Sequence, residues 1–138
     1  MLWYEIEDGL VIVHIAGQST TRERYALFAR IRHDSRVPAG AMVLIDALAA
    51  DIDLFTEADA LHRIKRTLHQ LAPKAGSVCA VVMRAVDPLE AHFFRRPGDR
   101  ADLRIGIFRD EPSARAWLKA FAVPDGVRAG VRSKRRIS

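Results

Sequence analysis

The stretch Ile105-Gly-Ile-Phe-Arg-Asp-Glu-Pro-Ser-Ala-Arg-Ala-Trp-Leu118 decides the fold. It opens as a short apolar strand, and Asp110 is placed to cap a helix whose first turn holds Glu111 and Pro112. Apolar side chains then follow at helical spacing, at Ala114, Trp117, Leu118 and Phe121. Because almost no loop separates the two elements, the helix must fold back over its own sheet. The stretch therefore predicts an α/β layer fold.

The N-terminal residues predict an antiparallel hairpin. Leu2–Glu7 alternates between apolar and polar residues, Asp8-Gly9 forms a two-residue turn, and Leu10–Ile15 is the second strand. His14 lies in this second strand, and we interpret it as an edge or satisfied core histidine rather than a metal ligand. Thr20, with a glutamate three residues later, forms a capping box for a helix that ends near residue 32.

The remaining chain alternates between strands and helices. Met42–Ile45 is predicted to be a strand that closes at Asp46, and its unbroken apolar character is typical of a central strand. The other expected elements are strands over 77–83 and 103–108, and helices over 56–71, 87–97 and 110–121. The predicted order is ββαβαβαβα. It describes a mixed five-stranded sheet with helices packed on it. Strands two to five are expected to run mostly parallel, and the first strand, at or near an edge, is expected to run antiparallel.

Charge divides the chain into a neutral body and a basic end. The chain carries 22 basic and 17 acidic residues, and its last eleven residues hold five basic groups and no acid. Residues 1–121 are therefore interpreted as one domain, and residues 122–138 as a basic tail that we expect to be disordered. Nucleic-acid binding is not expected except through this tail, because a nucleic-acid-binding domain normally carries its basic face on the folded body.

Several features indicate a soluble, cytoplasmic protein. Cys79 is the single cysteine and lies in an apolar run, which is typical of a buried thiol in a reducing compartment. The N-terminal residues do not follow the pattern of a signal peptide. No uncharged apolar run approaches the roughly 18 residues that span a bilayer, so no transmembrane segment is expected.

With these elements placed, the chain resembles the SpoIIAA-like, STAS-type bacterial domains over residues 1–121. The resemblance rests on the hairpin start, the apolar strand ending in Asp46, the run Val78-Cys-Ala-Val-Val-Met83, and the closing Phe-Arg-Asp…Ala-Trp-Leu. In fold, such domains are similar to anti-sigma-factor antagonists and to CRAL-TRIO lipid carriers. The resemblance implies a binding or regulatory module without catalysis, which engages a protein partner or itself. The alternative that it implies is a carrier of a lipid or another small apolar ligand.

The chain departs from the antagonists at their phosphorylation site. Those members commonly carry Asp-x-Ser after the third strand, whereas here Asp46 is followed by Ala-Leu-Ala-Ala and the first hydroxyl is that of Thr56. Thr56 is already explained as the cap of the next helix. We therefore do not expect regulated phosphorylation.

Segment 46–55 is the most interesting loop, because open α/β sheets bind ligands at the carboxyl ends of their strands. Its aspartates are a candidate magnesium site. With no phosphate-binding motif beside them, we prefer a surface for a protein partner or a second copy. The predicted partner-binding residues are Asp46, Leu48, Asp51, Asp53, Phe55 and Thr56.

Catalytic motifs are missing from the sequence. There is no nucleophile elbow, no phosphate-binding glycine loop and no Cys-x-x-Cys, so we predict no enzymatic activity, no cofactor and no metal. If the chain carries a lipid, Phe93 and Phe94 of the predicted third helix are the expected gate. The simpler interpretation places one of them in the core.

Overall fold

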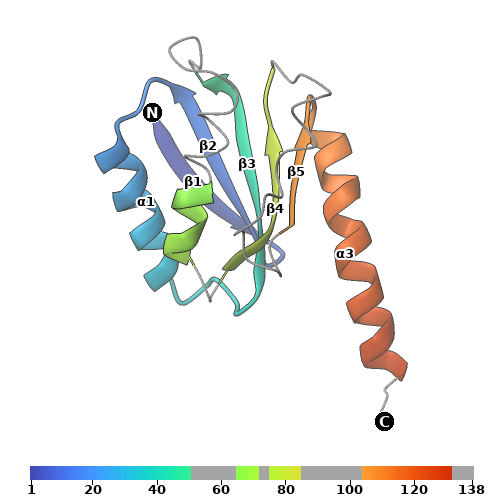
Figure 1. The fold of residues 1–138 in the computed structure, drawn as a ribbon. Helices are drawn as coiled ribbons and strands as arrows, with labels where there is room; N and C mark the ends of the chain where they lie inside the picture. Colours follow the sequence, from blue (N-terminus) through green and yellow to red (C-terminus); the bar gives the residue numbers. More distant parts are fainter. Residues whose placement is uncertain (51–64, 72–74, 85–103, 132–138) are drawn as a thin grey trace.

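The computed structural model describes residues 1–50, 65–71, 75–84 and 104–131. These residues form one five-stranded sheet whose spatial order, β1-β2-β3-β4-β5, is the same as the chain order (Figure 1). The strands are β1 Leu2–Glu7, β2 Leu10–Gly17, β3 Ala41–Ala50, β4 Ala75–Val82 and β5 Arg104–Phe108. β1 runs antiparallel to β2, and all other neighbours are parallel. The α/β class, the N-terminal hairpin and the antiparallel edge strand are thus confirmed.

The hairpin forms because its turn residues accept left-handed backbone angles. Asp8 has φ 51° and Gly9 has φ 79°. These angles match a type I′ turn, whose twist agrees with that of the flanking strands. The turn fixes the register, so that Glu7 lies opposite Leu10 and Leu2 lies opposite Ile15.

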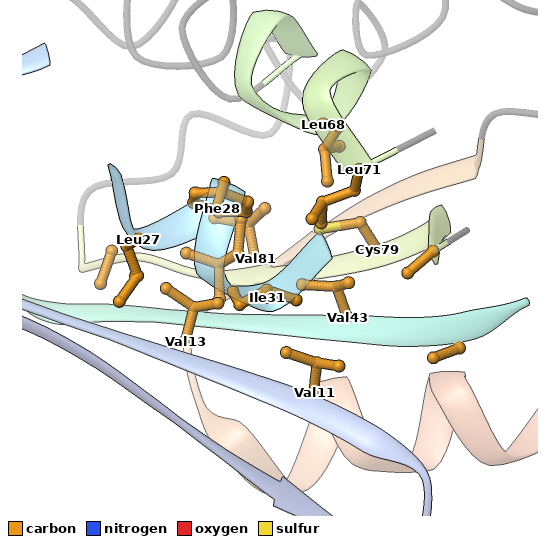
Figure 2. Close-up of a cluster of buried hydrophobic side chains, with 14 of the residues drawn as sticks. Val11, Val13, Leu27, Phe28, Ile31, Val43, Leu68, Leu71, Cys79 and Val81 are labelled. Carbon is orange, nitrogen blue, oxygen red and sulfur yellow. The ribbon is translucent and has the colours of Figure 1, made fainter. Parts of the chain in front are cut away.

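Helices lie on both faces of the sheet. Helix α1 (Thr21–His33) and the helical segment 65–71 lie on one face, and α3 (Glu111–Val131) lies on the other (Figure 1). Figure 2 shows α1 and the 65–71 segment packing their apolar side chains on the strands. The side chains at the centre of this face are fully or almost fully buried: Val11, Val13, Leu27, Phe28, Ile31, Val43, Leu68, Leu71, Cys79 and Val81. Burial of each large side chain contributes roughly 1.5–3 kcal/mol.

Two of the three predicted helix caps, Thr20 and Asp110, lie in the described residues, and both are present. The Glu23 backbone N–H donates to Thr20 Oγ1 at 3.0 Å, and the Thr20 N–H donates to the Glu23 carboxylate at 2.8 Å. At the start of α3, the Ser113 N–H donates to Asp110 Oδ1 at 2.7 Å. Each cap satisfies donors that the helix itself leaves free, and each carboxylate lies at the positive end of a helix dipole.

Two predicted boundaries were wrong. β3 does not end at Asp46 but continues to Ala50, because Ala49 and Ala50 pair with Ala16 and Gly17 after a shift in register between β2 and β3. α3 continues to Val131, ten residues beyond the predicted end near residue 121. The predicted helix over 87–97 and the start of the helix at Thr56 lie outside the described residues.

Polar contacts fasten α1 to the edge strand. The Tyr4 hydroxyl donates to Asp34 Oδ2 at 2.7 Å, directly after α1, and Arg36 donates to both oxygens of the same carboxylate. The guanidinium of Arg30 lies 5.7 Å from the centre of the Tyr4 ring. Burial, the hydrogen bond to Asp34 and the negative charge of Asp34 raise the pKa of Tyr4. The edge strand is thus held to α1 by defined contacts.

Candidate functional site

The structure describes two of the eight predicted site residues. Asp46 and Leu48 are described, and both lie within β3 rather than in the loop that the sequence predicted. The Leu48 N–H donates to Asp46 Oδ1 at 3.2 Å. The other predicted residues lie outside the described part of the chain: Asp51, Asp53, Phe55, Thr56, Phe93 and Phe94.

Because Asp46 lies within β3, it forms a row with side chains of the two preceding strands. Trp3 of β1 lies opposite His14 of β2, and His14 lies opposite Asp46 of β3. Opposed residues in neighbouring strands point to the same face of a sheet. This face is the one that also carries α3, which packs on β3, β4 and β5.

Glu5, two residues further along β1, adds a second carboxylate to this row. His14 Nε2 lies 2.7 Å from Glu5 Oε2, and His14 Nδ1 lies 3.3 Å from Asp46 Oδ2. The imidazole is therefore held between carboxylates on two different strands. When the ring is protonated, both of its nitrogens donate; when it is neutral, only one does.

Trp3 covers the histidine. The rings of Trp3 and His14 are stacked, with centroids 4.9 Å apart and an interplanar angle of 16°. The side chain of His14 is 18% exposed, whereas Trp3 remains 42% exposed. The stack orders an indole that still presents much of its surface to solvent. We name Trp3, Glu5, His14 and Asp46 the tryptophan–histidine cluster.

A further ion pair joins α3 to the same region. Arg115 Nη1 donates to Glu7 at 2.7 Å, and its Nε donates to Glu111 at 2.9 Å. These carboxylates raise the pKa of Arg115. Glu7 shares its face of β1 with Trp3 and Glu5, so the first turns of α3 are fixed relative to the cluster.

The geometry of the cluster suits recognition more than chemistry. Both ring nitrogens of His14 face carboxylates, so the ring has no nitrogen directed at a substrate. Within the described part of the chain, no three side chains of the metal-ligating types are placed to hold a metal ion. Cys79, the thiol in the described core, is fully buried, and burial raises its pKa far above the ordinary value. A buried thiol with a raised pKa is a poor nucleophile.

Sequence reasoning missed the cluster except for Asp46. From the sequence, His14 is interpreted as an edge or satisfied core histidine, and no role is predicted for Trp3 or Glu5. The sequence does contain one signal for the contact between Trp3 and His14, which is the hairpin turn. A two-residue turn at Asp8-Gly9 places Trp3 opposite His14 by counting alone.

Comparison of the chain with protein families, with curated proteins and with solved structures finds no match to any of them. Among the described helices, none has the length and apolar character needed to cross a membrane.

Proposed function

We propose that this chain is a non-catalytic, STAS-like binding or regulatory module that engages a protein partner or itself through the tryptophan–histidine cluster. The observation that carries the proposal is the exposed, pre-ordered indole of Trp3. Tryptophan is enriched among the residues that dominate the energy of protein interfaces. An indole that is already stacked on His14 also loses little freedom on binding.

The surroundings of Trp3 support a protein partner. The acidic groups of the cluster supply a polar rim around an apolar centre, as in many protein interfaces. The mixed sheet with its N-terminal hairpin supports the STAS-like assignment. A cytoplasmic location belongs to the same proposal, since a single buried cysteine suits a reducing compartment.

The proposal is tested by quantitative capture from an extract of the cells that contain the protein. Wild type, Trp3→Ala and Arg22→Ala are immobilised in equal amounts. Arg22 lies exposed on α1 and serves as the matched control. Trp3→Ala should weaken capture of a specific protein at least about tenfold, because a central interface tryptophan contributes about 2 kcal/mol or more. Arg22→Ala should capture as wild type does.

Equal capture by Trp3→Ala and wild type would contradict a partner surface at the cluster. Circular dichroism of the Trp3→Ala variant provides the folding control. Trp3 is 42% exposed, so its removal should leave the core intact.

A further inference from the structure

β1 presents a free backbone edge within the described part of the chain. It is the first strand in the sheet order, and β2 is the neighbour with which it pairs. The Ala16 N–H donates to the Met1 carbonyl at 2.9 Å, which fixes residue 1 as a hydrogen-bonded position of the hairpin. Since such positions alternate, Trp3, Glu5 and Glu7 direct their backbone groups to β2. Leu2, Tyr4 and Ile6 direct theirs outward.

Two exposed apolar side chains lie on this strand or directly before it. In the portion of the chain that the structure describes, the exposed large hydrophobic residues are Met1, at 72%, and Trp3, at 42%. On the opposite face of β1, Leu2, Tyr4 and Ile6 are only partly buried and pack on the edge of the core under α1. Edge strands of soluble proteins are usually short, bulged or charged to prevent pairing. The charged residues of β1, Glu5 and Glu7, are bonded to His14 and Arg115 within the protomer, so the apolar residues of the strand remain available to a partner.

We propose that β1 pairs antiparallel with β1 of a second copy, with Tyr4 on the two-fold axis. The proposal deepens the proposed function by naming the partner as the chain itself. In this register Leu2 lies opposite the second copy's Ile6, and the two Tyr4 residues lie opposite each other. The outward-facing residues 2, 4 and 6 are symmetric about residue 4, so each finds a partner in the second copy. Three such pairs exchange about six backbone hydrogen bonds. Two five-stranded sheets become one continuous sheet.

Side-chain chemistry selects this register over its neighbours. On the cluster face it places Trp3 opposite Glu5 of the second copy, so no carboxylates are directly opposed. A shift by two residues in one direction would place the two Glu5 carboxylates opposite each other, which is destabilising. A shift by two in the other direction would leave Ile6 without a partner and would lose about two backbone hydrogen bonds. A shift by one would pair residues that point to opposite faces.

The polar groups near the axis are satisfied within each protomer. The Tyr4 hydroxyl donates to Asp34, and Glu5 is bonded to His14. Pairing of the strands therefore buries no polar side chain that lacks a partner. The apolar parts of Leu2, Tyr4 and Ile6 would cover one another across the junction.

Disulfide trapping tests the register. Trp3→Cys and Glu5→Cys are purified separately and then oxidised alone and as a mixture. In the proposed register these two positions lie directly opposite, about 4.5 Å apart at Cα, within the range that a disulfide spans. The mixture should yield a cross-linked heterodimer at least about tenfold faster than either variant alone yields a homodimer. The native Cys79 is buried and does not compete. Faster homodimer formation by either variant alone would refute the register.

Amide exchange of the unmodified chain tests the pairing without any substitution. Hydrogen exchange is followed by NMR from about 10 µM to about 1 mM chain, which brackets weak association. The amides of Leu2, Tyr4 and Ile6 should slow at least about tenfold with concentration, whereas those of Trp3 and Glu5 should not change. If the amides of Leu2, Tyr4 and Ile6 exchange fast at every concentration, and analytical sedimentation finds only a monomer, the proposal is overturned. A Trp3-dependent capture of another protein would in that case leave the proposed function standing with a different partner.

Discussion

The sharpest prediction concerns which carboxylate holds His14. Distance favours Glu5, at 2.7 Å, over Asp46, at 3.3 Å. Exposure favours Asp46, whose side chain is 25% exposed, while that of Glu5 is 59% exposed. Solvent screens exposed pairs so strongly that they contribute about 0–1 kcal/mol, whereas partly buried pairs are screened much less. We therefore expect the less exposed Asp46 to stabilise His14 more than Glu5 does.

Two double-mutant cycles measure the difference. Asp46→Asn and Glu5→Gln each remove a charge at nearly constant shape, and His14→Phe removes both ring nitrogens while it keeps an aromatic ring against Trp3. The expected coupling free energy is about 1–1.5 kcal/mol for Asp46 with His14, slightly above the range of exposed pairs because this ion pair is partly buried. For Glu5 with His14 we expect about 0.5 kcal/mol.

Urea denaturation of each variant supplies the unfolding free energies. The measurements are made at a pH low enough to protonate the histidine, and then repeated in about 1 M salt, where the Debye length falls to about 3 Å. The Glu5 coupling should then vanish, and most of the Asp46 coupling should persist. A Glu5 coupling that equals or exceeds that of Asp46 would refute the reasoning from exposure.

Two further predictions test the framework around the cluster. Hydrogen bonds from Arg36 and Tyr4 hold the pKa of Asp34 well below its usual value, so its contribution to stability is full above about pH 4 and is lost as the pH falls through the lowered pKa. Asp34→Asn should therefore lower the free energy of unfolding near neutral pH, and urea titrations should show the difference narrowing below about pH 4. Gly106→Ala should destabilise the fold by about 1–3 kcal/mol, because its Cβ would lie 2.8 Å from Phe108 Cε2 and 3.1 Å from Trp117 Cε2. In thermal unfolding, Phe108→Leu should partly rescue this variant; additive losses would contradict the clash.

The parts of the fold that were predicted correctly are those encoded within a few residues. The turn at Asp8-Gly9 and the caps at Thr20 and Asp110 each depend on contacts between residues two or three apart. The parallel arrangement of β2 to β5 followed from the helical crossovers expected between successive strands. None of these inferences needs knowledge of how distant segments align.

The end of β3 could not be predicted for the opposite reason. Ala49 and Ala50 have little intrinsic preference for a strand, and they extend because Ala16 and Gly17 of β2 are available as partners. The contact between Asp46 and His14 depends on the same parallel register, which is set by packing of the whole crossover. The contact between Trp3 and His14 differs, since the hairpin turn alone determines it.

One hairpin thus determines both the contacts of Trp3 and Glu5 with His14 and the free edge. Side-chain direction and hydrogen-bond direction alternate along a strand with the same period of two residues. The turn at Asp8-Gly9 therefore sets Trp3 and Glu5 toward His14 and, by the same alternation, sets the backbone groups of Leu2, Tyr4 and Ile6 outward. A shift of one residue in this register would turn the indole under α1 and would direct a different set of amides to the edge. For this reason, the proposed recognition through Trp3 and the proposed pairing through β1 both depend on a single local geometry, which the chain encodes within its first fifteen residues.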